Sequence, residues 1–237
     1  MADFGADHIR RSHCRGCGHA LGEALISLGP MPLANELLTP GGGGESGGES
    51  FPLDVALCPT CGLAQLLDDI RPSRLFEGYS YLTGTSETMS QHFDAYGAAV
   101  AEALGGAGAR ALEIGANDGA LLGALKARGL RCLGVEPGAG PASVAKGRGL
   151  EIIEAFFDGP EAQGILWERG PFDGIIANNV LAHVDAPGGV LRACQGLLSP
   201  GGRVIVEFPG ALALLRGGHW DTIYHAHRPY LSRTALA

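Results

Sequence analysis

The sequence predicts an α/β protein in which a doubly wound parallel sheet follows a small metal-binding module. Two observations carry this prediction. From residue 110 onward, short apolar runs alternate with helical stretches, as strands alternate with crossover helices in parallel sheets. Before residue 70 lie two Cys-x-x-Cys pairs, a pattern typical of a zinc module. A length of 237 residues, at roughly 150 per domain, accommodates one large domain and one small module.

Five apolar runs are predicted to be the strands of the sheet: 111–114, 132–136, 151–154, 172–177 and 203–208. Amphipathic stretches predict the helices around them: 87–104, 120–128, 141–147, 161–169 and 188–198. In such sheets ligands bind beyond the carboxyl ends of the strands. We therefore expect function in the residues that directly follow each strand.

Composition excludes several classes of protein. Hydrophobic residues make up 46% of the chain and charged residues 18%, which is a globular balance. A formal net charge of −8 offers no general attraction for nucleic acid. The first residues lack the features of a signal peptide, and no run of about 18 apolar residues predicts a membrane span. We expect a soluble cytoplasmic protein without nucleic-acid or membrane partners.

The two cysteine pairs are predicted to hold one structural zinc ion. Each pair is followed by a glycine, which suits a tight turn that presents two thiolates. The predicted ligands are Cys14, Cys17, Cys58 and Cys61. Four cysteines leave no open coordination position, so the zinc would not be catalytic. A redox Cys-x-x-Cys or a set of coincidental buried thiols is the alternative.

Nearby histidines and the other cysteines receive no such role. His13 and His19 are expected on the surface, and Cys132 and Cys194 are expected to be small buried apolar residues.

We expect three successive regions: a zinc module at 8–70, a connector with a helix at 71–108, and a cofactor-binding domain at 109–237. The module is expected to have little core of its own and to need the metal to fold. Residues 40–50 are rich in glycine and are expected to form a mobile loop.

A glycine-rich turn between the first strand and its helix predicts a cofactor site. Its candidate residues are Glu113, Gly115, Asn117, Asp118 and Gly119. The turn lacks the second glycine of the dinucleotide pattern, and its carboxylate would repel a pyrophosphate. S-adenosylmethionine carries an ammonium and a sulfonium but no phosphate, so it fits better than NAD or flavin. A generic tight turn is the structural alternative.

Two further strand ends contribute candidates to this site. Glu136, at the end of the second strand and followed by Pro137, is placed to receive ribose hydroxyls. Asn178 and Asn179 follow the fourth strand and are expected to face the cofactor. A surface glutamate and turn-forming asparagines are the alternatives.

Several motifs follow one another along the chain. They are Phe-Pro-Leu-Asp-Val-Ala-Leu-Cys-Pro-Thr-Cys-Gly-Leu-Ala-Gln at 51–65, Tyr-Ser-Tyr at 79–81, Glu-Ile-Gly-Ala-Asn-Asp-Gly at 113–119, Gly-Val-Glu-Pro at 134–137, Asn-Asn-Val-Leu-Ala-His-Val at 178–184, Glu-Phe-Pro at 207–209 and Asp-Thr-Ile-Tyr-His-Ala-His at 221–227. In this order they resemble the motifs of the S-adenosylmethionine-dependent C-methyltransferases of deoxysugar biosynthesis. This family also carries an N-terminal four-cysteine zinc-binding domain.

The resemblance implies a class I methyltransferase with a Rossmann-like sheet that methylates C3 of a nucleotide-linked 4-keto-deoxysugar, in antibiotic or surface-glycan biosynthesis. A base removes the acidic proton beside the ketone, hydrogen bonds stabilise the enolate, and the carbanion attacks the sulfonium methyl. By position the resemblance makes His227 the base. It also places Tyr224, Tyr81 and His183 around the sugar. Packing or local hydrogen bonding is the alternative role for each.

The sequence departs from the family at the end of the sheet. The family's sheet continues with a sixth and a seventh strand and a C-terminal domain, which the sequence does not show, so we expect a truncated family member or a split gene product. We expect marginal solubility or a second chain that supplies the missing region.

Two other functions stay open. One is a non-catalytic subunit that binds zinc and cofactor. The other is a C-methyltransferase that acts on a small acceptor other than a sugar.

The family motif Tyr-His-Glu-His has Ala226 in place of its glutamate. A carboxylate there would support the charge of the neighbouring histidine, so its loss is expected to lower the pKa of the base and to reduce methylation. We therefore predict that Ala226→Glu raises the rate of methyl transfer to a 4-keto-sugar. An unchanged rate would contradict this explanation of the departure.

Overall fold

The computed structural model describes residues 7–34, 49–76 and 81–236, and contacts divide the chain into two compact units. The cysteine unit is drawn from Met1–Leu75, Leu181–Pro187 and Phe208–Ala237. The sheet unit comprises Phe76–Val180 and Gly188–Glu207. The cysteine unit therefore contains segments from distant parts of the sequence, whereas only residues 181–187 separate the two segments of the sheet unit. The three successive regions expected from the sequence stay a prediction.

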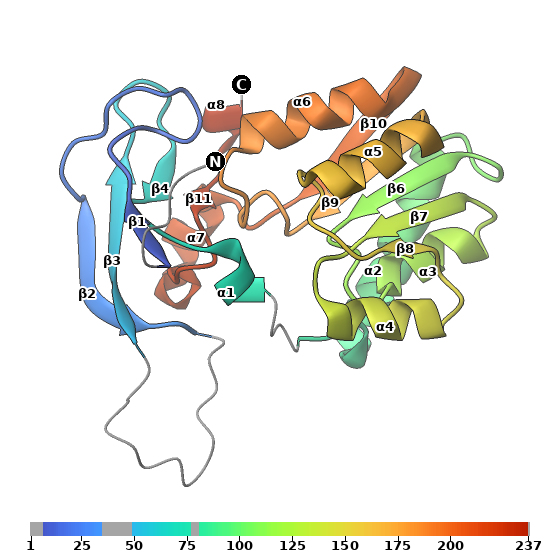
Figure 1. Cartoon of the computed structure of the whole chain (residues 1–237), viewed down its shortest axis with the longest axis horizontal. Helices are drawn as coiled ribbons and strands as arrows, with labels where there is room; N and C mark the ends of the chain where they lie inside the picture. Colours follow the sequence, from blue (N-terminus) through green and yellow to red (C-terminus); the bar gives the residue numbers. More distant parts are fainter. Residues whose placement is uncertain (1–6, 35–48, 77–80, 237) are drawn as a thin grey trace, which may run out of the picture. The chain divides into compact units, whose positions relative to one another are not determined.

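The sheet unit contains five strands, all parallel, in the order β10-β9-β6-β7-β8 (Figure 1). Their bounds are β6 (Arg110–Ile114), β7 (Arg131–Val135), β8 (Ile152–Ile153), β9 (Phe172–Asn178) and β10 (Leu198–Glu207). Strand β6 is central, with Leu112 opposite Leu133 on one side and Ile175 on the other. The predicted doubly wound sheet is confirmed. Strand β10 begins at Leu198, where the sequence predicts the last residue of a helix.

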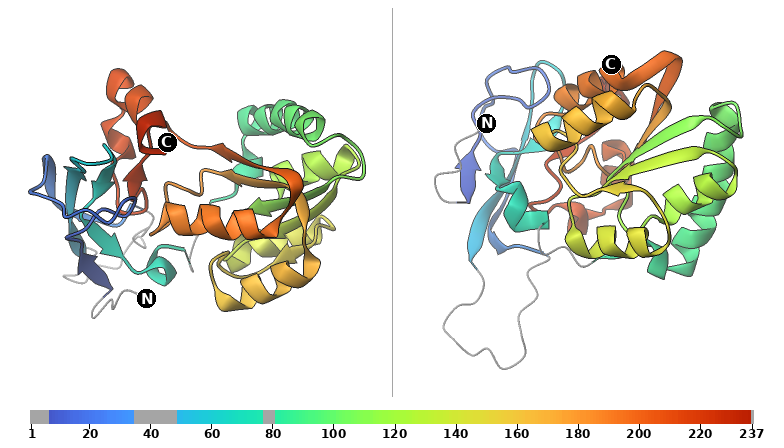
Figure 2. Two further views of the ribbon diagram at one scale, coloured as in Figure 1. Left: turned by 90° about the horizontal axis from the view of Figure 1, so that it is seen from above. Right: turned by 45° about the vertical axis from the view of Figure 1, so that its right-hand side comes forward.

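Helices cover both faces of this sheet. Their bounds are α2 (Glu87–Ala103), α3 (Ala120–Ala127), α4 (Ala139–Gly147), α5 (Pro160–Arg169) and α6 (Pro187–Leu197). Helices α2 and α3 lie together on one face, and α5 and α6 lie on the other (Figure 2). Phe93 and Val100 of α2 pack with Leu121 and Leu125 of α3 in one core cluster. The side chain of Ser86 caps α2 by accepting from the Met89 amide. A short 3-10 turn, η1 (Thr83–Thr85), precedes this cap.

The cysteine unit is built on an antiparallel sheet of four strands in the order β11-β4-β3-β2 (Figure 1). These are β2 (Ile26–Pro32), β3 (Ser50–Leu57), β4 (Ala64–Leu66) and β11 (Pro229–Tyr230), and a second pair joins β1 (His8–Arg10) to β5 (Asp68–Ile70). The short helices are α1 (Pro72–Phe76), α7 (Ala211–Gly217), η2 (Trp220–Thr222) and α8 (Arg233–Leu236).

A buried cluster of Leu53, Val55, Leu66 and Tyr230 forms a core in the cysteine unit. The sequence-based expectation of a module with little core was incomplete, because Tyr230 reaches this core from a distant part of the chain. Most of the glycine-rich stretch, and Tyr79 of the connector motif, lie outside the described residues. Within the described ranges, every helix is too short or too polar to cross a lipid bilayer.

Candidate functional site

The four cysteines meet at one point in the cysteine unit. Among the described residues, their sulfur atoms form a cluster in which every pair lies within 4.8 Å. Cys14 Sγ lies 3.6 Å from Cys61 Sγ, and Cys17 Sγ lies 3.6 Å from Cys58 Sγ. Tetrahedral zinc with bonds of about 2.3 Å would hold sulfur atoms about 3.8 Å apart. The cluster therefore fits zinc.

The two knuckles of this cluster have matching backbone turns. Gly18 N donates to Cys14 O, and Gly62 N donates to Cys58 O. Both glycines have positive φ angles, 74° and 69°, which explains the glycine after each cysteine pair. His13 and His19 are exposed and lie outside the cluster, as expected. Cys132 and Cys194 also lie outside it.

Gln65 is a contributor to this site that sequence reasoning missed. Its buried amide Nε2 donates to Cys14 Sγ at 3.1 Å. Burial raises the pKa of Cys14, but hydrogen bonds from the backbone of Cys17, from Gln65 and from the backbone of Gly16 outweigh it and lower the pKa to about 6. The surroundings of Cys14 therefore favour the thiolate that zinc requires. Gln65 follows the second knuckle by only four residues, but its sequence has no pattern that marks it as a partner of Cys14.

The glycine-rich turn in the sheet unit joins β6 to α3. Gly115 has a φ of 67°, and a Cβ there would lie 2.7 Å from Val180 Cγ2. Gly119 has a φ of 77°, and a Cβ there would lie 2.2 Å from Leu150 Cδ1. Both positions thus favour glycine for their backbone conformation, and a larger residue would also have to displace a neighbouring side chain.

Asn117 and Asp118 hold the connector against this turn. Asn117 Oδ1 accepts from Thr83 N at 3.0 Å, and its Nδ2 donates to the Tyr81 carbonyl. Asp118 Oδ2 accepts from Gly84 N at 2.9 Å. The sequence did not predict this clamp. A cofactor contact by Asn117 or Asp118 stays a prediction.

Glu136 lies at the carboxyl end of β7, beside the turn. Its Oε2 accepts from Asn117 N at 2.9 Å and its Oε1 from Gly138 N at 2.7 Å. Burial raises the pKa of Glu136, and these two hydrogen bonds oppose the rise. Burial raises the pKa of Glu113 well above its usual range, and the negative charges of Glu136 and Asp118 raise it further. The turn thus gathers three carboxyl groups away from water.

At the end of β9, Asn178 Oδ1 accepts from the Tyr96 hydroxyl at 3.1 Å. Asn179 has a positive φ of 55°, and its backbone N donates to Glu207 O. Glu207 also pairs with His92 Nε2 at 2.9 Å. Sequence reasoning missed Tyr96 and His92, because both lie on a helix whose amphipathic pattern indicates packing alone.

Three buried polar atoms around these strand ends have no hydrogen-bond partner within the described part of the chain. They are Glu113 Oε2, Asp118 Oδ1 and Asn178 Nδ2. Buried polar atoms without partners are costly, so such a group indicates a polar ligand. The site fits S-adenosylmethionine, because its carboxyl-rich surroundings favour a cation and the glycines admit close approach.

His227, Tyr224 and His183 come together in the cysteine unit. His227 Nδ1 donates to Thr222 O at 3.0 Å, which leaves Nε2 as the acceptor for the Tyr224 hydroxyl at 2.8 Å. His183 Nδ1 donates to Ala226 O at 2.7 Å, and its ring centre lies 4.9 Å from that of His227.

Both histidines of this group favour the neutral form. Burial lowers the pKa of His227, while the hydrogen bond to Thr222 opposes the shift. Burial and then the neighbouring His227 lower the pKa of His183 to about 4. Neutral His227 with Nε2 as acceptor can take up a proton. Tyr81 belongs to the sheet unit, where its carbonyl accepts from Asn117 and its side chain is exposed.

Comparisons with known proteins agree with this geometry. The sequence profile of the methyltransferase domain family matches residues 89–237, and a second profile, for a zinc binding domain, matches residues 14–76. The doubly wound sheet with its glycine-rich turn is the class I fold of S-adenosylmethionine-dependent methyltransferases. The chain belongs to the methyltransferase domain family.

The chain is similar to "C-methyltransferase NovU" of Streptomyces niveus, with 35% identity over 225 residues, which cover 94% of this chain and 53% of the relative. The chain thus spans about half the length of that relative. A ubiquinone biosynthesis O-methyltransferase of Marinobacter nauticus is 35% identical over 43% of the chain and 44% of its own length. The resemblance drawn from the motifs is confirmed by the first of these similarities.

Two solved structures share the fold. A SAM-dependent methyltransferase from Archaeoglobus fulgidus is 18% identical, with a TM-score of 0.51 over 62% of this chain and 65% of that one. The plantazolicin methyltransferase BamL, solved with SAH, is also 18% identical, with a TM-score of 0.51 over 63% of this chain and 60% of its own.

We predict that the purified chain holds about one zinc per molecule, and that Cys58→Ser loses it and unfolds the cysteine unit, because a shell of three thiolates binds zinc weakly. Metal analysis and circular dichroism measure both effects. Cys194→Ser is the control, since this buried cysteine lies outside the cluster. Full zinc content in Cys58→Ser would contradict the assignment.

The lowered pKa of His183 predicts a pH dependence of stability. Between pH 6.5, its usual pKa, and about pH 4, the unfolded chain binds a proton at His183 that the folded chain does not. The free energy of unfolding therefore falls as the pH drops through this window. Denaturant titrations are expected to give a smaller fall for His183→Gln than for the exposed control His19→Gln. Equal slopes would show that His183 does not titrate in this way.

Proposed function

We propose that this chain transfers a methyl group from S-adenosylmethionine to C3 of a nucleotide-linked 4-keto-deoxysugar. The observation that carries the proposal is the hydrogen-bonded pair of His227 and Tyr224. Methylation of carbon needs a base that removes a proton beside a carbonyl, and a neutral imidazole with an accepting Nε2 suits that role. Similarity over most of the chain to a relative named as a C-methyltransferase supports the same reaction.

The cofactor is proposed to bind at the glycine-rich turn. Gly115 and Gly119 let it approach the backbone, Glu136 receives the ribose hydroxyls, and Asn178 Nδ2 gains a partner. When bound, S-adenosylmethionine supplies a methyl group on a positively charged sulfur. Pro137 and Asn179 complete the set of residues proposed to line it.

The chemistry of the acceptor is then proposed to depend on His227, Tyr224 and His183. Nε2 of His227 takes the proton from C3, and the electron pair of that C–H bond forms the enolate. The Tyr224 hydroxyl turns from Nε2 to donate to the enolate oxygen, and His183 lies beside it. The C3 carbanion takes the methyl group as the carbon–sulfur bond breaks, and that electron pair stays on sulfur. Tyr81 is proposed as a further residue of the sugar site.

Ala226 favours a second candidate, a non-catalytic module that binds zinc and cofactor. Its side chain is a buried methyl, so it offers no carboxylate to the histidines beside it. For either function we propose a cytoplasmic location, where the four thiolates stay reduced.

Hydrogen–deuterium exchange tests the base without the full reaction. The zinc-loaded chain is incubated in D₂O with a nucleotide-linked 4-keto-sugar and S-adenosylhomocysteine, whose binding is measured by calorimetry. Exchange at C3 is expected to be at least 100-fold faster with the wild type than with His227→Gln, the usual scale of general base catalysis. His13→Gln is the matched surface control. Cofactor binding without exchange on any keto-sugar would favour the non-catalytic module.

A further inference from the structure

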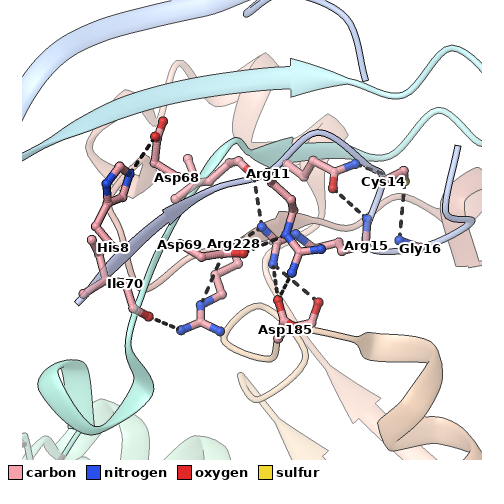
Figure 3. Close-up of polar contacts among 12 residues, drawn as sticks. His8, Arg11, Cys14, Arg15, Gly16, Asp68, Asp69, Ile70, Asp185 and Arg228 are labelled. Carbon is pink, nitrogen blue, oxygen red and sulfur yellow. Dashed lines mark hydrogen bonds and ion pairs between the residues drawn. The ribbon is translucent and has the colours of Figure 1, made fainter. Parts of the chain in front are cut away.

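A buried cluster of charges lies in the cysteine unit around Asp69 (Figure 3). The Asp69 carboxylate accepts from Arg11 Nε at 2.7 Å and from Arg15 Nη2 at 2.9 Å, and Arg228 Nε lies 3.9 Å from Asp69 Oδ1. The side chains of Asp69, Arg15 and Arg228 are at most 1% exposed. Burying such charges is costly unless each has partners in good geometry. Loss of one member therefore leaves the others in an unfavourable environment.

The cluster reaches the zinc site through Arg15. This residue lies within the first knuckle, between Cys14 and Cys17. Its backbone N donates to Gln65 Oε1 at 2.9 Å, and Gln65 Nε2 donates to Cys14 Sγ. The path of the knuckle therefore determines where the Arg15 guanidinium lies.

The cluster reaches the candidate base through Arg228, the residue after His227. Arg228 Nη2 donates to Ile70 O at 2.6 Å, and its backbone N donates to Ala182 O at 2.7 Å. Ala182 directly precedes His183, so the bond from Arg228 N to Ala182 O holds the backbone next to His183. The backbones that carry both histidines are thus joined at Arg228.

A second carboxylate ties the segment of His183 to the same arginines. Asp185 pairs with Arg11 Nη2, and Arg15 Nη1 lies 3.6 Å from its Oδ1 (Figure 3). Arg11 and Arg15 thus contact two carboxylates, those of Asp69 and Asp185. Because Asp185 is only two residues from His183, these contacts also hold the segment that carries this histidine.

We propose that Asp69 is a positioning residue that couples the four-cysteine zinc site, through Arg15, to the backbone of His227, through Arg228. This inference rests on the proposed function for the role of His227 as base. With zinc bound, the knuckle places Arg15 against Asp69, and Asp69 holds Arg228 beside it. Without zinc, Arg15 loses its fixed place, and the hydrogen bond from Tyr224 to His227 Nε2 loosens. The zinc site then sets the geometry of the base although it takes no part in the chemistry.

The test compares Asp69→Asn with Asp68→Asn in the full zinc-loaded chain. Asp68 is a matched control, because it is equally buried on the same strand but pairs with Arg10 and His8. Nitrogen-15 NMR of the histidine rings reports the hydrogen bond at His227 Nε2, with His227→Gln as the assignment standard. Asp69→Asn is expected to keep about one zinc and to shift the Nε2 signal, and Asp68→Asn is expected to leave that signal in place.

The steady-state kinetics of methyl transfer provide a second test of the inference. Asp69→Asn is expected to lower kcat at least tenfold, because a misplacement of about 1 Å in a reacting group can cost about 100-fold, with KM for S-adenosylmethionine changed less than twofold. Asp68→Asn is expected to stay within twofold of the wild type for both. Equal losses in the two variants would overturn the inference.

Two further measurements keep the inference testable if Asp69→Asn fails to fold. The conservative variants Asp69→Glu and Arg15→Lys, each with zinc bound, are each expected to shift the His227 Nε2 signal in one common direction. An unchanged His227 Nε2 signal in both measurements would overturn the inference. Because the NMR signal needs no substrate, coupling without turnover on a keto-sugar would contradict the proposed function and leave the inference intact.

Discussion

The pairing of β11 with β4 is the interaction on which the cysteine unit depends. It joins residues 229–230 to residues 64–65, which lie more than 160 positions earlier in the sequence. Leu66 N donates to Arg228 O at 2.8 Å, so the ladder continues to the residue beside the candidate base. This pair closes the core with Tyr230 and fixes the segment of Tyr224 and His227 next to β4.

Local pattern predicted the sheet unit well, since most of its strands and helices have an apolar run or period of their own. Gly115 and Gly119 were predictable because their positive φ angles favour one residue type. The cysteine quartet was predictable for a similar reason, because zinc binding requires a fixed spacing within each pair. In all of these cases the constraint acts over a few residues.

The remaining features of the fold and of the site depend on contacts between residues that are far apart in the sequence. The periodicity of apolar residues does not encode such contacts. Strands β4 and β11 have only three and two residues, too few to show alternation. Asp68 and Asp69 are adjacent acidic residues that would suit a solvated surface, yet both are buried among arginines from other segments. The clamp of Asn117 on the connector was equally invisible, because its donor is a backbone amide 34 positions earlier.

The discontinuous make-up of the cysteine unit sets an order for its assembly during synthesis. All four zinc ligands lie within the first 61 residues, so the knuckles can take up metal while the sheet unit is still being made. The strand that completes the unit, and the candidate base beside it, come more than 160 residues later. Chains are made from the N-terminus at about 5–20 residues per second, so the early module waits at least several seconds for its last strand. During that time β4 has an open edge, and the bound metal maintains the second knuckle, directly before the strand that β11 will join.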